Sequence, residues 1–206
     1  MSKILKNLTT SAMGLMGAGA GNERSRLLRV IREKSYREGD FTLASGQKSS
    51  FYVDVKTSTL HPEGAYLVGR LMVEAVQKAG WNVQAVGGLT LGADPIATSV
   101  SLAAHAKSIH WPAFIVRKES KGHGTGKYIE GIENIPEKGR VLILEDVTTT
   151  GGSAITAIER VKEAGFQIAG VATVVDRQQG AAEKFKEAGV PFLALVTLEE
   201  VRAVKL

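Results

Sequence analysis

Residues 140–153 read RVLILEDVTTTGGS and mark the clearest change from strand to helix in this chain of 206 residues. The apolar run 141–144 has the form of a strand buried on both faces, and the apolar spacing after residue 153 is helical. Two adjacent acids, three threonines and two glycines lie between them. Backbone N–H groups, hydroxyls and a helix dipole converge at such a loop, which therefore predicts an anion-binding site. No Gly-Lys-Ser/Thr sequence closes it, so it is not a Walker A motif.

The same alternation of strand and helix signals extends through most of the chain. Short apolar runs predict further strands at 85–87, 113–116, 168–175 and 192–196, and helical patterns lie at about 94–107, 152–165 and 180–189. Strands that alternate with helices are typical of an α/β domain with a mainly parallel sheet flanked by helices. Ligands of such sheets bind beyond the carboxyl ends of the strands, so residues there are the first candidates for a site.

Residues 1–22 differ from the rest of the chain. Two lysines precede a Gly/Ala/Met stretch, and Ala18-Gly19-Ala20 resembles the cleavage site of a signal peptide. Polar residues interrupt the apolar segment, however, so we expect a flexible N-terminal extension instead. An amphipathic helix pattern begins at Glu23. Residues 23–206 are expected to form a single domain.

The composition limits the possible functions. Hydrophobic residues make up 44% of the chain and charged residues 23%, as in a globular domain. The chain has no apolar run of about 18 residues, so the sequence predicts no membrane-spanning helix. The chain has no cysteine, which excludes disulfides and thiolate metal sites and is compatible with a cytoplasmic location. A formal charge of +5 favours anionic partners, but no familiar nucleic-acid-binding pattern is present, so we expect neither nucleic acid nor membrane as a partner.

The acid pair and the Thr/Gly loop after it resemble the signature with which type I phosphoribosyltransferases bind 5-phosphoribosyl 1-diphosphate (PRPP). The resemblance implies the fold of that superfamily, with a small N-terminal hood formed by elements at about 23–60. It also implies that Glu145 and Asp146 hold the ribose hydroxyls of PRPP. The residues that would surround the 5-phosphate are Thr148, Thr149, Thr150, Gly151, Gly152 and Ser153, and Val147 is a further PRPP-binding residue. The simpler alternative is a capped helix start with two solvated acids.

Residues 117–126, RKESKGHGTG, combine cations with glycines directly after a predicted strand. Such a stretch can be a solvated loop, or a lid that closes over a diphosphate leaving group. It resembles the mobile catalytic loop of orotate phosphoribosyltransferases. The resemblance implies that Arg117, Lys118, Lys121 and His123 contact PRPP, the last three as catalytic residues. In that family the loop reaches into the neighbouring subunit's site, which implies a homodimer with a lid shared across subunits.

Arg177 follows the strand predicted at 168–175 and can offer a planar fork to a carboxylate. It matches the arginine with which the family binds orotate, and Thr149 matches a threonine that touches the same base. Residues 41–54 resemble the family's hood over the base. Together these features imply that orotate is the acceptor.

Residues 87–97, GGLTLGADPIA, resemble the family's diphosphate loop, whose glycines would let the backbone approach the ligand closely. The chain departs from some members at two positions, because Gly92 and Ala44 stand where those members have lysine. One expected contact to diphosphate is therefore absent, or another residue supplies it.

The implied reaction joins orotate and PRPP to give orotidine 5-phosphate and diphosphate, a step of de novo UMP synthesis. The resemblance implies that Mg2+ arrives with PRPP, so no cluster of protein metal ligands is expected. His123 could act as an acid toward the diphosphate, since histidine titrates near neutrality. Two alternatives are a phosphoribosyltransferase for another base and a regulator that senses PRPP without catalysis.

Overall fold

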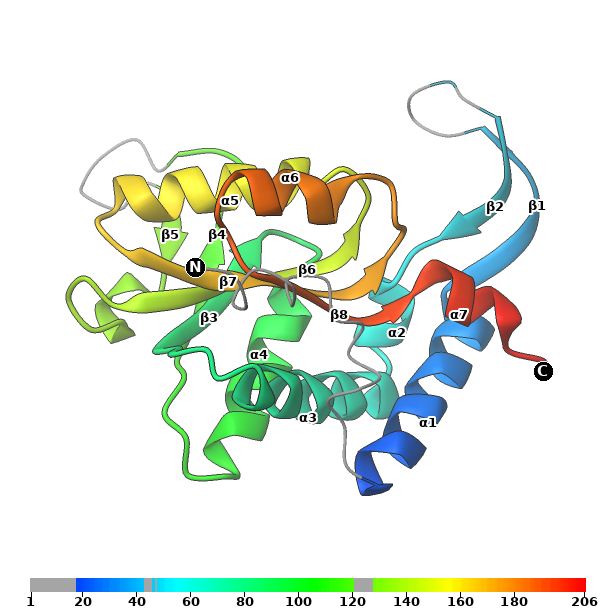
Figure 1. The fold of residues 1–206 in the computed structure, drawn as a ribbon, viewed down its shortest axis with the longest axis horizontal. Coiled ribbons are helices and arrows are strands. Elements are labelled where there is room, and N and C mark those ends of the chain that lie inside the picture. Colours follow the sequence, from blue (N-terminus) through cyan, green and yellow to red (C-terminus); the bar gives the residue numbers. More distant parts are fainter. Residues whose placement is uncertain (1–17, 43–45, 47, 121–127) are drawn as a thin grey trace, which may run out of the picture.

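The structure, a computed structural model, describes residues 18–42, 46, 48–120 and 128–206. Its main feature is a six-stranded sheet in the order β5-β4-β3-β6-β7-β8 (Figure 1). Neighbouring strands run parallel except for the edge strand β5, which is antiparallel to β4. The strands are β3 Ala85–Leu89, β4 Ala113–Val116, β5 Ile129–Glu130, β6 Arg140–Thr148, β7 Gln167–Asp176 and β8 Phe192–Thr197. The predicted α/β class and mainly parallel sheet are confirmed.

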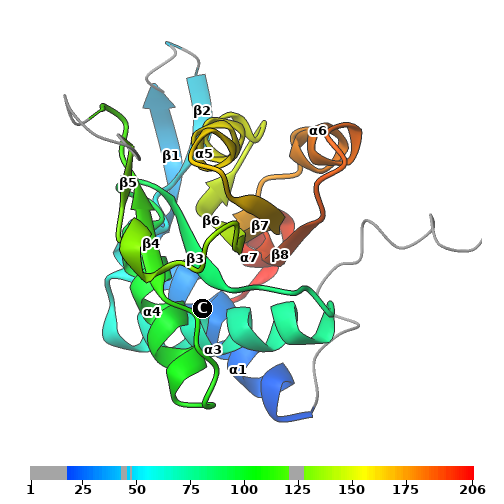
Figure 2. The same ribbon diagram turned by 90° about the vertical axis from the view of Figure 1, so that its left-hand side faces the viewer.

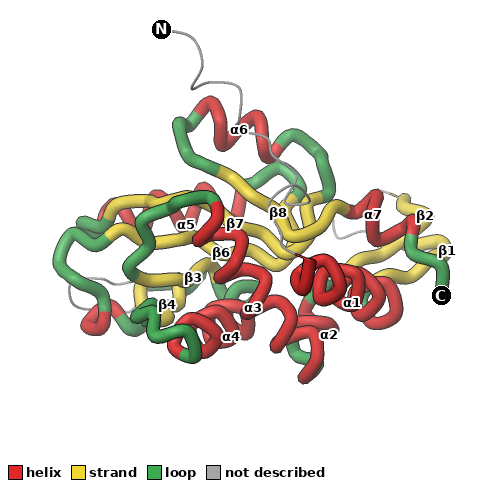
Figure 3. The backbone as a smooth tube through the Cα atoms, turned by 60° about the horizontal axis from the view of Figure 1, so that its bottom comes forward, coloured by secondary structure: helices red, strands yellow, loops and turns green. Residues whose placement is uncertain are grey.

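Helices cover both faces of this sheet. One face carries α1, α3 and α4, which lie side by side in Figure 3, and Figure 2 shows α5 and α6 on the other face. The helices are α1 Ala18–Lys34, α2 Lys56–Thr59, α3 Pro62–Lys78, α4 Asp94–His105, α5 Gly152–Glu163, α6 Ala181–Glu187 and α7 Leu198–Ala203, with a short 3-10 helix, η2, at Ile132–Asn134.

The central strand β6 explains why the sheet is buried on both faces. Its side chains alternate, so Leu142 and Leu144 belong to the apolar core under α3 and α4. Val141 and Ile143 belong to the second core, under α5. All four side chains are fully buried, as a continuous apolar run in a parallel sheet requires.

A separate hairpin forms the predicted hood. Strands β1, Tyr36–Thr42, and β2, Lys48–Val53, pair antiparallel and project away from the main sheet (Figure 1). At the base of the hairpin the rings of Tyr36 and Phe51 stack with centroids 5.9 Å apart. This contact joins the hairpin to the larger core, of which Tyr36 is a member.

The predicted N-terminal boundary is wrong by several residues. Helix α1 begins at Ala18, so residues 18–22, assigned to the flexible extension, are helical. Alanine is the strongest helix former, but the alternating Ala and Gly of this stretch have no apolar periodicity by which to recognise a helix. Residues 1–17 lie outside the described residues.

Candidate active site

The carboxyl end of β6 leads directly into the predicted phosphate loop. Gly151 is the N-cap of α5 and has a φ of +77°, a conformation that glycine adopts without strain. A Cβ atom at Gly151 would also lie 2.8 Å from the ring of Phe185, so only glycine fits there. A hollow of about 170 Å3 lies over this turn, lined by Glu145 and Val147 to Ala154. The backbone and hydroxyl groups of the motif therefore surround one space at a helix N-terminus, where an anion is stabilised.

The two acids of the motif have different environments. Glu145 is 7% exposed, and its Oε1 atom is buried with no hydrogen-bond partner among the described residues. Burial, and then the charge of Asp146, raises the pKa of Glu145 to about 8. Asp146 instead accepts a hydrogen bond from the backbone N–H of Val147, at 2.8 Å. At pH 7 Glu145 is therefore mainly protonated.

Arg177 lies between the phosphate loop and the hood. Its backbone N–H donates to the carbonyl of Thr148 at 2.9 Å, and its guanidinium lies 5.5 Å from the centroid of the Phe51 ring. Nε of Arg177 and Oγ1 of Thr148 are buried without a partner among the described residues. Buried polar groups are normally hydrogen-bonded, so these two atoms are left available to a ligand.

The start of the predicted lid is attached to α5. Arg160 donates from its guanidinium to the backbone carbonyls of Arg117 and Lys118, the second at 3.0 Å. Arg117 also pairs with Glu130 at 2.9 Å. The structure thus places Arg117 and exposed Lys118 at the carboxyl end of β4, whereas Lys121 and His123 lie outside the described residues.

The role predicted for the first two glycines of the diphosphate loop is wrong. Gly87 and Gly88 are buried in β3, where added Cβ atoms would lie about 2.2 Å from the carbonyl oxygen of Phe114 and 2.1 Å from that of Leu144. These glycines permit close packing of strands and helices, not the predicted approach to a diphosphate. Gly92 does border the site, since its Cβ would lie 2.6 Å from Oδ1 of Asp146.

Lys56 is a residue that the sequence-based predictions missed. It opens α2, and its Nζ lies 2.8 Å from Oδ1 of Asp54 and 3.8 Å from Oδ2 of Asp146. The hydrogen bond to Asp54 is the main cause of a raised pKa for Lys56, although burial opposes the shift. No pattern in the sequence relates residues 56 and 146, because only the fold brings them together.

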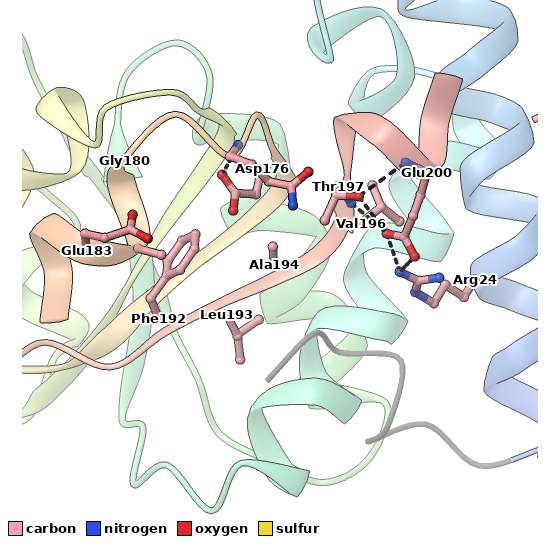
Figure 4. A pocket seen from close by; sticks show the side chains of 12 residues that line it. Arg24, Asp176, Gly180, Glu183, Phe192, Leu193, Ala194, Val196, Thr197 and Glu200 are labelled. Atoms are coloured by element: carbon pink, nitrogen blue, oxygen red, sulfur yellow. Dashed lines mark hydrogen bonds and ion pairs between the residues drawn. The ribbon is translucent and has the colours of Figure 1, made fainter. Parts of the chain in front are cut away.

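A larger pocket, of about 280 Å3, lies between α6, β8 and α7 (Figure 4). It contains none of the predicted site residues. Arg24 on its wall is bonded to Glu200, at 2.8 Å to each carboxylate oxygen. Asp176 and Glu183 also line it, so the pocket would repel phosphates. We therefore assign the site to the phosphate loop.

None of the helices in the described residues is long and apolar enough to cross a bilayer. Within the same residues, no three or more His, Asp or Glu side chains cluster as metal ligands.

The comparisons with known proteins agree with this geometry. Residues 55–192 match the family model described as the phosphoribosyl transferase domain. The chain is 44% identical to the orotate phosphoribosyltransferase of Nostoc sp. over 202 residues, which cover 98% of this chain and 96% of the relative. The chain belongs to the orotate phosphoribosyltransferase family.

Solved structures of this family have the same fold. An orotate phosphoribosyltransferase of Mycobacterium tuberculosis H37Rv in complex with Fe(III) dicitrate superposes with a TM-score of 0.76 at 42% identity, covering 87% of this chain and 98% of that one. The same enzyme in complex with PRPP gives a TM-score of 0.72 at 40% identity, covering 87% and 99%. The type I phosphoribosyltransferase fold predicted from the sequence is thus confirmed.

Proposed function

We propose that this member of the orotate phosphoribosyltransferase family transfers the 5-phosphoribosyl group of PRPP to orotate. The observation that carries the proposal is the set of buried, unpartnered polar atoms at one end of the sheet: Oε1 of Glu145, Oγ1 of Thr148 and Nε of Arg177. The carboxyl of Glu145 suits the ribose hydroxyls, the hydroxyl of Thr148 suits the 5-phosphate, and the guanidinium of Arg177 suits the orotate carboxylate. Each would gain its missing hydrogen bond from one part of the substrates.

In the proposed reaction, the bond between C1 of the ribose and the diphosphate oxygen breaks. A bond forms between C1 and the orotate nitrogen, whose proton is released. Arg177 orients orotate through its carboxylate, with Thr149 beside the base, and so supplies the alignment that a two-substrate displacement needs. The loop from Val147 to Ser153 holds the 5-phosphate, while Glu145 and Asp146 hold the ribose hydroxyls.

Mg2+ dependence is part of the proposal. Mg2+ prefers oxygen ligands and is usually held by one or two carboxylates together with substrate phosphates. The phosphates of PRPP would supply most of these ligands, and Asp146, next to the phosphate loop, would supply a carboxyl oxygen from the protein. When bound, the ion would neutralise charge on the diphosphate. Activity should therefore be lost in EDTA and restored by added Mg2+.

We also propose a homodimer whose lids are shared between subunits. Arg117 and Lys118 begin the lid at the edge of the site, and Lys121 and His123 complete its cationic set. A groove of about 500 Å3 between α3 and α4, lined by Tyr66 and Leu102 among others, offers an apolar face for a second copy.

The cytoplasmic location of the protein stays a prediction. So does the expectation that the protein binds neither nucleic acid nor membranes.

The activity is tested by mixing the purified protein with orotate, PRPP and Mg2+ and following the loss of orotate absorbance. We expect consumption that stops when either PRPP or Mg2+ is omitted. If the protein binds PRPP without consuming orotate, the acceptor is another base or the protein is a regulator. If it does not bind PRPP, the assignment of the phosphate loop is wrong.

A further inference from the structure

Four residues from three separate segments meet beside the phosphate loop. Lys56 and Asp54 come from the end of the hood, Gly92 from the loop before α4, and Asp146 from β6. Nζ of Lys56 contacts both carboxylates, at 2.8 Å and 3.8 Å. A Cβ at Gly92 would touch the same Asp146 carboxylate, so Gly92 and Lys56 both border Asp146. Lys56 therefore joins the hood to the acid pair of the PRPP motif.

The charges around this point leave a deficit of positive charge. Residues 87–97 contain Asp94 but neither lysine nor arginine. Asp146 is acidic, and PRPP adds the negative charge of its diphosphate. The guanidinium of Arg160 is bonded to backbone carbonyls, and that of Arg117 to Glu130, so both are occupied in the described structure. Any cation that meets a diphosphate at this loop must therefore come from another segment. The predicted lid supplies Lys118, Lys121 and His123, and the end of the hood supplies Lys56 beside Asp146.

Lys56 has the properties of that cation. Its side chain is 41% exposed, so its ammonium group is accessible to a ligand. An ammonium has three donors, and the 2.8 Å contact with Asp54 uses one of them. The hydrogen bond to Asp54, with the charges of Asp146 and Asp54, raises its pKa, so the group is protonated at neutral pH.

We propose that Lys56 is a substrate-binding residue of the diphosphate subsite, which Asp54 holds in position and which supplies the positive charge that the loop 87–97 lacks. The inference rests on the proposed function only in taking PRPP as the ligand, because the contacts of Lys56 are observed in the structure itself. In the free protein Lys56 screens the charge of Asp146. On binding PRPP, Nζ donates to a diphosphate oxygen while its contact with Asp54 persists.

The competing explanation is an ion pair with a purely structural role. In that case the variants Lys56→Met and Asp54→Asn, which remove opposite members of the pair, would have similar effects. A diphosphate-binding role predicts a difference, because only Lys56→Met removes the group that touches the ligand. Lys78→Met is a matched control, since Lys78 forms a comparable pair with Glu74, at 2.7 Å, within α3.

The test measures equilibrium binding by calorimetry, with Mg2+ present, for three ligands: PRPP, inorganic diphosphate and ribose 5-phosphate. For Lys56→Met we expect the affinity for PRPP and diphosphate to fall about 10- to 100-fold, as for loss of one charged hydrogen bond. Affinity for ribose 5-phosphate, which lacks the diphosphate, should stay within about threefold. Lys56→Arg, which keeps the charge, should recover most of the PRPP affinity.

Lys78→Met should leave PRPP affinity within about twofold of the unmodified protein. Asp54→Asn keeps the ammonium of Lys56 but weakens its anchor, so it should lower PRPP affinity by about fivefold, less than Lys56→Met does. Equal losses for all three ligands, or equal effects of Lys56→Met and Asp54→Asn, would overturn the assignment, as would unchanged PRPP binding in Lys56→Met. The melting temperature of each variant is measured as well, so that a folding defect can be distinguished from a binding defect. The binding assay does not use orotate, so a protein that binds PRPP but rejects orotate would contradict the proposed acceptor and leave this test intact.

Discussion

Gly92 lies directly against Asp146: a Cβ atom on Gly92 would stand 2.6 Å from Oδ1, 2.7 Å from Cγ and 2.8 Å from Oδ2 of the carboxylate. These separations are far inside van der Waals contact. The Asp146 carboxylate is also fixed by the backbone N–H of Val147, at 2.8 Å. The side chain at position 92 therefore controls where one acid of the PRPP motif can lie.

The variant Gly92→Ala tests this relationship. The new methyl group would push the Asp146 carboxylate away from its bond to Val147 and out of line with the ribose hydroxyls. We expect kcat/KM for PRPP to fall about tenfold, the equivalent of roughly one hydrogen bond, with little change in melting temperature. Steady-state kinetics at saturating orotate measure the effect. Full activity in Gly92→Ala would mean that Asp146 does not need its observed position.

Arg177 is expected to determine the acceptor. Arg177→Ala removes the fork offered to the orotate carboxylate, so KM for orotate should rise by about 100-fold or more, while PRPP affinity changes little. Arg177→Lys keeps the charge but not the bidentate geometry and should recover only part of the loss. Parallel measurement of orotate KM and PRPP binding distinguishes the two ligands. A variant that loses PRPP instead of orotate would reassign Arg177 to the phosphate subsite.

Arg160 is expected to act through the lid. It holds the backbone carbonyls of Arg117 and Lys118, and its guanidinium stacks 4.2 Å from the centroid of the Tyr128 ring. Arg160→Leu should lower kcat by roughly 5- to 20-fold, because the start of the lid loses its attachment, as expected for a group that controls closure. Arg140→Leu, at the exposed opposite end of β6, is the control and should leave kcat unchanged. Equal kcat values for the two variants would show that the attachment has no catalytic role.

The acid pair predicts an unusual dependence of stability on pH. Burial and Asp146 raise the pKa of Glu145 to about 8 from 4.5, so between these values the folded state binds more protons than the unfolded chain. Stability should therefore fall as pH rises from about 4.5 to 8. Glu145→Gln removes the titration and should raise the melting temperature by roughly 5 °C at pH 8.5, with little effect at pH 4.5. Identical melting curves at pH 8.5 would contradict the raised pKa.

PRPP affinity should have the opposite pH dependence. Hydroxyls that donate to Glu145 favour its ionised form, so binding releases its proton and the affinity should increase from pH 6 until about pH 8. In Glu145→Gln this increase should disappear, apart from the contribution of the titration of PRPP itself. Calorimetry in buffers of different ionisation enthalpy measures the released protons directly. The same proton release in both proteins would exclude Glu145 as its source.

In the proposed homodimer, the exposed apolar side chains on α3 and α4 would form the interface. Tyr66 is 56% exposed and Leu102 is 66% exposed in the single chain. Leu102→Glu should place a charge in the interface and shift the protein to monomers, with loss of activity if the lids are shared. Leu206→Glu changes a leucine at the C-terminus that is 74% exposed and serves as the control. Light scattering gives the mass, and an active monomer of Leu102→Glu would exclude a shared lid.

Much of the fold could be predicted because its signals are local. The run 141–144 is apolar without interruption, since β6 is buried on both faces, and the residues that line the phosphate hollow follow it in consecutive positions. Arg177 was also predictable, because parallel strands bring their carboxyl ends to one edge. The start of α1 was missed because Ala and Gly at 18–21 give no periodic pattern.

The rest of the site depends on contacts between distant segments. Lys56 and Arg160 are unremarkable in sequence, and each acquires a role only by facing Asp146 or the carbonyl of Lys118 across the fold. Gly87 and Gly88 were interpreted as ligand contacts because glycine lacks a Cβ atom, and this allows either close packing of the backbone or close approach to a ligand. The sequence does not distinguish these two roles, whereas the structure shows close packing.

The most direct measurement is the product formed from PRPP and Mg2+ with different acceptors. The protein should be incubated with orotate, with uracil, which lacks the carboxylate, or with adenine, and each nucleotide should be quantified against the diphosphate released. We predict one orotidine 5-phosphate per diphosphate with orotate, and rates lower by at least about 100-fold with the other two bases. Efficient transfer to uracil or adenine, or no transfer to orotate by protein that binds PRPP, would contradict the proposed function.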